Sequence, residues 1–205
     1  MLSLRGGGRN LFGRKDGKML APAQLYEDKL REESIKAWYR PENIYLDGGP
    51  GNEVIDLPED NCDRHCFVSV DKEDNVIGYI GYHVDWSAMS ADGLCIISYR
   101  KGSVEFARDV YDAIYNLFHT YHMNRVAWYA WTDNPAVRGY RRFIRKYGGR
   151  ECGIQRQVAR LQDGKLHDSI NFEILASEFR GGKNPGIGYD VARYGGGKGK
   201  ESNVP

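Results

Sequence analysis

Residues 94–131, LCIISYRKGSVEFARDVYDAIYNLFHTYHMNRVAWYAW, contain the pattern that decides the fold. The continuous apolar run at 94–98 predicts a short strand buried on both faces, because a half-buried strand would alternate polar and apolar residues. Residues 103–121 place apolar side chains at the helical period, and Ser103 is a residue type favoured at the N-cap. A second apolar run at 125–131 predicts another buried strand. Strand, helix and strand in this order predict a parallel pair joined by a right-handed crossover.

The chain on both sides of this stretch predicts the remainder of a mixed sheet. Two pairs of strands are each separated by a short polar turn, which is typical of hairpins. Two further segments carry apolar residues at the helical period. The expected elements are helices at 24–39 and 135–147 and strands at 65–70, 76–86, 151–161 and 167–175. We therefore expect a single α/β (α+β) domain whose mixed, mostly antiparallel sheet is flanked by helices.

Both ends of the chain are basic and rich in glycine. The arm at residues 1–19 has five basic residues against one acidic residue, and the tail at residues 179–205 has five against two. Such segments bury too little apolar surface to offset their ordering entropy, roughly 1–2 kcal/mol per residue. We expect both to be flexible alone and to become ordered only on a partner, or else to act as solubilising linkers. The folded domain is then expected at residues 20–178.

Composition points away from a membrane protein and from a metal centre. No apolar run approaches the length of a membrane span, and the N-terminus has no apolar signal-peptide core. We therefore expect a cytoplasmic protein without membrane contact. Cys62 and Cys66 form one close pair, but no second pair follows to complete a structural zinc site. We expect four free thiols in a reducing compartment and no bound metal.

Three passages resemble the GNAT superfamily of N-acetyltransferases. They are the strand-to-helix junction at 96–103, the strand at 126–131, and the segment Asp133-Asn134-Pro135-Ala136, which leads through an amphipathic helix to Gly148-Gly149. The last of these is the most specific. The resemblance extends from about Cys66 to Ile174, roughly half of the chain. It implies a single GNAT-like domain.

The resemblance implies a binding site for acetyl-CoA between the two parallel strands. The pyrophosphate would lie at the loop before the helix, because backbone N–H groups and the helix dipole at that end favour an anion. A tyrosine would act as the acid that protonates the leaving thiolate. The cofactor-binding residues implied in this chain are Arg100, Lys101, Gly102, Ser103, Val104 and Asn134.

The sequence departs from the family pattern at two places. The phosphate loop of the family commonly begins with Gln or Arg and ends with Gly or Ala, where this chain has Tyr99 and Val104. The acidic tyrosine commonly lies four residues before the glycine that closes the helix, and that position is Ile144 here. Tyr140 lies one turn earlier on the same face, so we predict that Tyr140 is the catalytic acid. The alternative is that Tyr140 is a core aromatic within an apolar stripe.

Other polar residues near these segments leave alternatives open. His83, Asp85 and Asp92 are candidates for the general base, although a carboxylate at a strand end is more often merely solvated. The run at 138–146 contains four Arg and one Lys without an acidic residue. It predicts a solvated helix face, or else a surface for the CoA 3′-phosphate, nucleic acid or an acidic protein.

Two functions follow from the resemblance. The first is an N-acetyltransferase that moves acetyl from acetyl-CoA to an unknown primary amine. The second is a catalytically silent GNAT-fold structural protein of a phage virion, whose tails are ordered by other virion proteins. The stretch at 142–148 is similar to small internal head proteins of short-tailed phages in its aliphatic residue at the acid position. The sequence does not decide between the two functions, because fold alone does not fix function. A nucleic-acid-modifying transferase that uses the basic run at 138–146 is a third hypothesis.

Overall fold

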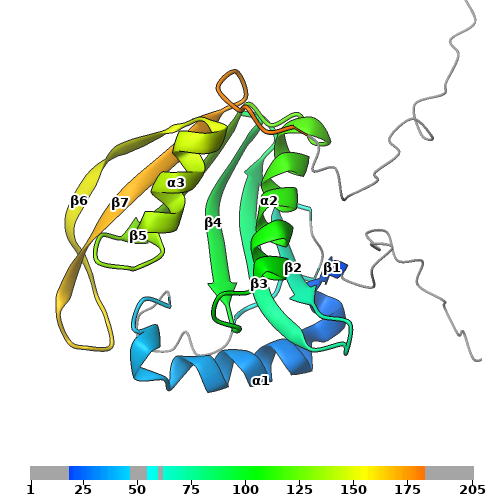
Figure 1. Ribbon diagram of the computed structural model, residues 1–205, viewed down its shortest axis with the longest axis vertical. Helices are drawn as coiled ribbons and strands as arrows, with labels where there is room; N and C mark the ends of the chain where they lie inside the picture. Colours follow the sequence, from blue (N-terminus) through cyan, green and yellow to red (C-terminus); the bar gives the residue numbers. More distant parts are fainter. Residues whose placement is uncertain (1–18, 47–54, 60–61, 183–205) are drawn as a thin grey trace, which may run out of the picture.

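The computed structural model describes residues 19–46, 55–59 and 62–182. These residues form a seven-stranded mixed sheet with three α-helices (Figure 1), and the strands lie in the order β1-β2-β3-β4-β5-β7-β6. Two short 3-10 turns flank the first helix, at Ala23–Tyr26 and Pro41–Asn43. The main elements are β1 Met19–Pro22, α1 Glu27–Trp38, β2 Arg64–Val70, β3 Val76–Asp85, β4 Ser90–Ser98, α2 Val104–His119, β5 Arg125–Trp131, α3 Val137–Tyr147, β6 Arg150–Arg160 and β7 Leu166–Leu175.

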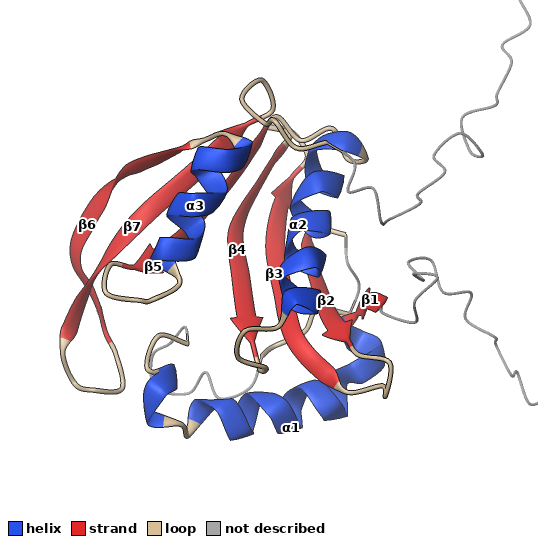
Figure 2. Cartoon of the chain, in the orientation of Figure 1, coloured by secondary structure: helices blue, strands red, loops and turns tan. Residues whose placement is uncertain are grey.

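The parallel pair predicted from residues 94–131 is confirmed as β4 and β5. These strands are paired only at Ser90–Arg125 and Ala91–Val126, and they diverge beyond those two pairs. The other neighbouring strands in the sheet are antiparallel. Figure 2 shows the opening between β4 and β5, with α2 and α3 on either side of it. The predicted mixed, mostly antiparallel sheet is therefore correct.

A bulge in β4 coincides with the start of this divergence. Gly81 of β3 pairs with Cys95, whereas His83 pairs with Asp92, so β4 contains one residue more than β3 over this interval. The additional residue lies at Gly93 or Leu94. A β-bulge bends its strand and leaves one residue without ladder partners. Gly93 has a φ of +61°, a conformation that residues with a Cβ adopt rarely.

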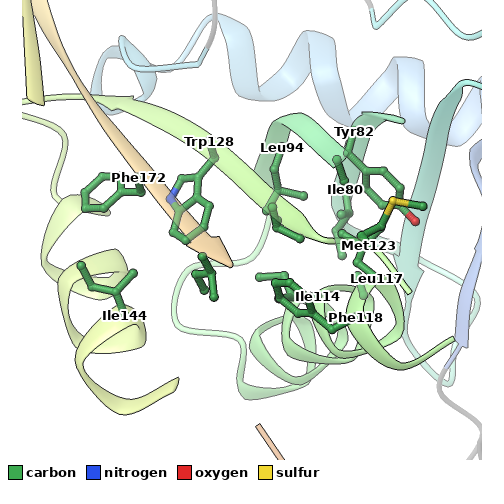
Figure 3. Close-up of a cluster of buried hydrophobic side chains, with 14 of the residues drawn as sticks. Ile80, Tyr82, Leu94, Ile114, Leu117, Phe118, Met123, Trp128, Ile144 and Phe172 are labelled. Carbon is green, nitrogen blue, oxygen red and sulfur yellow. The ribbon is translucent and has the colours of Figure 1, made fainter. Parts of the chain in front are cut away.

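The sheet separates two apolar cores. Helices α2 and α3 cover one face, where Ile80, Leu117 and Met123 are fully buried (Figure 3). Helix α1 covers the opposite face, where Leu30 packs with Val68 and other residues of β2 and β3. Burial of each large aliphatic side chain contributes about 1.5–3 kcal/mol. Because successive side chains of a strand point to opposite faces of the sheet, the same central strands contribute to both cores.

Helix α2 begins where the sequence predicts. The hydroxyl of Ser103 accepts a hydrogen bond from the Phe106 N–H at 3.1 Å, which is the geometry of an N-cap. Phe106 then packs against β3 at Gly78, where a Cβ atom would collide with the aromatic ring. The absence of a side chain at Gly78 therefore lets the first turn of α2 approach the sheet.

Several element boundaries differ from those predicted from the sequence. The strand predicted at 94–98 begins at Ser90, because the Asp85 carboxylate accepts hydrogen bonds from the N–H groups of Ser87 and Ala88 and closes a tight turn. Strand β1 was not predicted, since its four residues are too few to show a period. The predicted first helix is divided into a 3-10 turn and α1. Residues 1–18 and 183–205, on which most of the tail prediction rests, lie outside the described residues.

Replacing Gly78 with alanine should destabilise the fold, because the new methyl group would overlap the buried Phe106 ring. Overpacking of this kind typically costs about 1–3 kcal/mol. The expected result is a lower free energy of unfolding in urea. Gly139→Ala is the matched control, since a Cβ there meets nothing within 4 Å and alanine favours the helix. Equal stability of the two variants would contradict the packing described for Gly78.

Candidate active site

A hollow lies between the diverging ends of β4 and β5, and we call it the splay hollow. Its volume is about 250 Å³. It draws residues from both strands, from α3 and from the segment that follows the second 3-10 turn. The residues that line it are Tyr45, Leu46, Gly93, Leu94, Cys95, Ile96, Ile97, Tyr129, Ala130, Trp131, Asn134 and Tyr140.

A second hollow of about 350 Å³ lies between α1 and strands β3 and β4, and we call it the α1 hollow. Aromatic and aliphatic side chains such as Trp38, Tyr79 and Ile97 form most of its wall. Among the described residues, the acidic and basic side chains that line it are those of Asp56, Arg64 and His83. A third, more open hollow lies over β5, β7 and β6, and includes Asp92 and Glu173.

The three hollows meet at the β4 bulge. Gly93 lines each of them, and the α1 hollow and the splay hollow also share Leu46, Cys95 and Ile97. A group bound in the splay hollow and a group bound in the α1 hollow would therefore both adjoin the same short piece of β4. An arrangement of this kind suits a reaction between two substrates.

Tyr140 lies in α3 and lines the splay hollow. Its ring makes edge contacts with Trp128 and Phe172, at centroid distances of 5.9 and 5.8 Å. Burial raises the pKa of Tyr140 to about 12, and the Cys95 thiol adds to that effect. No hydrogen-bond partner for its hydroxyl occurs among the described residues. The phenol is therefore protonated at neutral pH, and its proton is available to a bound molecule.

Asn134 reaches the same hollow from the loop between β5 and α3. Its side-chain oxygen accepts a hydrogen bond from the Ala136 N–H at 2.9 Å, which fixes the orientation of the amide. This bond closes a turn, so α3 begins at Val137, two residues later than predicted. The side-chain NH₂ group of Asn134 remains as a donor toward a ligand.

The predicted phosphate loop lies outside the splay hollow. The Arg100 guanidinium pairs with the Asp71 carboxylate at 2.7 Å, and Asp71 is almost completely buried. Although burial opposes it, hydrogen bonds from the Asn75 N–H and from Arg100 lower the pKa of Asp71. Arg100 therefore anchors the loop to the turn between β2 and β3.

The remaining loop residues keep features that suit an anion. Gly102 has a φ of +71° and open space where a Cβ would be, and Ser103 caps α2. The Val104 side chain is 64% exposed, so it points toward solvent. Lys101 is exposed at the same end of the helix. The structure thus brings Asn134 and Tyr140 into one hollow and leaves residues 100–104 at the start of α2.

Tyr45 was not singled out in the sequence, and a cluster of polar groups holds it beside the splay hollow. His167 of β7 is buried, with its ring nitrogens 3.1 Å from the Asp133 carboxylate and 3.0 Å from that of Asp163. The Tyr45 ring packs edge-on against His167, and its hydroxyl interacts with Asp133. The cluster joins three loops that are distant in sequence, so no local pattern could reveal it.

The basic run in α3 is mostly exposed to solvent. Arg141 forms a bidentate pair with Glu151 of β6, at 2.8 and 3.1 Å. The rest of the run, Arg138, Arg142, Arg145 and Lys146, has no ion-pair partner within the described ranges. These residues do not line the splay hollow or the α1 hollow.

Several general features bear on the class of protein. In the described part of the chain, none of the four cysteines forms a disulfide bond. Across residues 19–46, 55–59 and 62–182, no cluster of three or more His, Cys, Asp or Glu side chains could hold a metal ion. Over the same residues, no helix is both long and apolar enough to cross a membrane.

The topology, the splayed parallel pair and the bulged β4 define a GNAT fold. Neither a protein-family model nor a curated protein matches the chain. Among solved structures, the spermidine/spermine N-acetyltransferase of Vibrio cholerae is similar at 25% identity and a TM-score of 0.50, over 58% of this chain and 68% of that chain. A probable GNAT-family acetyltransferase of Chromobacterium violaceum is 18% identical with a TM-score of 0.59, over 80% and 91% of the two chains.

The His167 cluster predicts a pH dependence of stability. Hydrogen bonding to Asp163 and then to Asp133 raises the pKa of His167 above its usual value of about 6.5. A raised folded-state pKa stabilises fully below the unfolded-state pKa, and this contribution is lost as pH rises through the folded-state value. The difference in free energy of unfolding between wild type and His167→Gln should therefore be larger at pH 6 than at pH 9. A difference that grows with pH would refute the assignment.

Proposed function

We propose that this chain is an N-acetyltransferase that moves acetyl from acetyl-CoA to a primary amine. The observation that carries the proposal is the Tyr140 phenol, which is protonated and without a hydrogen-bond partner in the described part of the chain, and which faces the splay hollow. The α1 hollow adjoins the splay hollow at Gly93 and gives the amine a separate route to the acetyl group.

In this proposal the extended arm of acetyl-CoA lies in the splay hollow. Beyond Ala91 and Val126 the facing edges of β4 and β5 are not paired with each other, so their backbone groups can bond to the amides of a ligand placed between them. The Asn134 amide adds a donor at the end of β5. The bulge at Gly93 leaves a backbone group of β4 outside the ladder, where it can meet the acetyl carbonyl oxygen.

The phosphates of acetyl-CoA would lie at the start of α2, where fewer side chains could bind them than in the family pattern. Arg100 is engaged by Asp71, so the backbone of the loop, the helix dipole and Lys101 must supply most of the attraction. Gly102 allows close approach of the backbone to a phosphate.

In this proposal Tyr140 donates its proton to the sulfur that leaves when the thioester is cleaved. Its buried ring is held by Trp128 and Phe172, which restricts the direction of the O–H group. Ile144, at the position where the family commonly has this tyrosine, is buried in the core and has no proton to give. Tyr140 is the tyrosine of α3 that lines the splay hollow.

The competing hypothesis, a silent structural protein of a virion, would act through the tails. The tails fall almost entirely outside the described residues, so no contact in the structure supports that role. Acetyl-CoA binding separates the two hypotheses, because a silent fold has no need of a splay hollow that accepts the ligand.

Acetyl-CoA should bind to the purified chain with a dissociation constant in the micromolar to low millimolar range, as measured by calorimetry. Release of the CoA thiol should then be measured with each of three acceptor amines: spermidine, tyramine and a peptide with a free N-terminal amine. Spermidine is included because one structural relative is a spermidine/spermine acetyltransferase. Failure to bind at millimolar acetyl-CoA would remove the enzyme hypothesis.

Tyr140→Phe should lower kcat by about 100-fold or more, in line with the usual contribution of an acid catalyst. Acetyl-CoA affinity should be unchanged, because the ring contacts with Trp128 and Phe172 persist. Tyr147→Phe in the same helix is the matched control, since Tyr147 does not line the splay hollow. If the two variants turn over at the same rate as wild type, Tyr140 is only a core aromatic.

A further inference from the structure

We propose that His83 is the general base that accepts a proton from the acceptor amine, with Asp92 as the residue that positions and stabilises it. The inference rests on the proposed acetyltransferase function and extends it to the second half of the reaction.

His83 lies between a basic and an acidic residue in a row that crosses three strands. In the antiparallel ladders, Arg64 of β2 is directly opposite His83, and His83 is directly opposite Asp92 of β4. Directly opposed residues project from the same face of a sheet. Both Arg64 and His83 line the α1 hollow, so the row borders the hollow assigned to the amine.

The row ends at the junction of the hollows. Asp92 immediately precedes Gly93, which lines all three of them. Neighbouring strands are about 4.8 Å apart, so a side chain opposite Asp92 is within reach of a nitrogen placed over the bulge. The other two base candidates do not share this position. Asp85 is engaged by the Ser87 hydroxyl and by two backbone N–H groups, and Asp92 lies outside the lining of the α1 hollow.

Asp92 is placed to stabilise the imidazolium that forms when His83 takes a proton. Its carboxylate oxygen is 3.8 Å from Nδ1 of His83, a distance suited to an ion pair. The proton from the amine would then be taken by Nε2, on the other side of the ring. The His83 side chain is 56% exposed, so it can return that proton to water.

Charged groups face His83 from its own strand and from both neighbouring strands. Asp92 faces it from β4, and Asp85 lies two residues along the same strand and interacts with it. Arg64 faces it from β2, and that guanidinium pairs with Asp56 at 3.5 Å. Two carboxylates and one paired cation therefore surround the ring that takes the proton in this proposal.

The complete proton balance uses two residues. The amine arrives as an ammonium ion, and His83 accepts its first proton. The nitrogen lone pair then forms the C–N bond to the acetyl carbonyl carbon, the C–S bond breaks, and sulfur takes the electron pair. Tyr140 donates a proton to sulfur and is restored by the second proton of the nitrogen through solvent. One proton remains on the amide, and His83 releases one to water.

The test uses His83→Ala with the panel amine that the wild-type chain acetylates fastest. At pH 7, kcat should fall roughly 100-fold or more, the effect expected for loss of a general base. The dissociation constant for acetyl-CoA should stay the same, because His83 does not line the splay hollow. Added imidazole should restore part of the rate, since the vacated position is exposed. His119→Gln, at an exposed position of α2, is the control and should behave as wild type.

Asp92→Asn provides the readout for the positioning role. The variant should lower kcat in the wild-type background but have little further effect in the His83→Ala background, because the carboxylate acts only through the imidazole. An equal loss of rate in both backgrounds would mean that Asp92 is merely structural and would overturn that part of the inference. A fully active His83→Ala variant, or a slow one that imidazole does not rescue, would overturn the role of His83.

These outcomes are separate from failure of the function itself. If wild type binds acetyl-CoA and acetylates an amine while His83→Ala is equally active, only the inference about the base is wrong. If wild type does not bind acetyl-CoA, the proposed function is wrong and the base has no reaction to serve.

Discussion

The early end of the pairing between β4 and β5 is the constraint on which the rest of the site depends. Two residue pairs join the strands, and the bulge at Gly93 then turns β4 away from its neighbour. Each strand keeps a buried apolar face packed against α2 or α3, so the opening removes little buried apolar surface from the core. The hollow that results reaches through the middle of the sheet, and Tyr140 and Asn134 meet there although they come from different elements.

Ion pairs at the periphery hold this opening in place. Arg100 ties the loop before α2 to Asp71, and Glu173 binds Arg125 and Arg150, so that β5, β6 and β7 stay together on the other side. Because Asp71 is buried while Arg100 is partly exposed, loss of Arg100 would leave a buried carboxylate without its ion-pair partner, whereas Glu173 would keep one of its two arginines. The opening between β4 and β5 is thus bordered on each side by segments that ion pairs hold together.

Much of the fold could be predicted from the sequence, because apolar periodicity reports directly on burial. Residues 103–121 and 125–131 carried that signal, and their helix and strand are nearly where it placed them. The bulge could not be predicted, because the expected strand began at Leu94 and left Gly93 outside it, although glycine inside a strand often marks a bulge. Tyr45 and the Arg100–Asp71 pair could not, because they depend on contacts between segments far apart in the chain.

The meeting of the hollows at Gly93 has a consequence for kinetic order. One ligand would enter between the strands and the other from beneath α1, so neither would have to leave before the other arrived. Such geometry favours direct transfer within a ternary complex over a ping-pong cycle in which the protein itself carries the acetyl group. Double-reciprocal plots for the two substrates would then intersect rather than run parallel, and no acylated side chain would accumulate between turnovers.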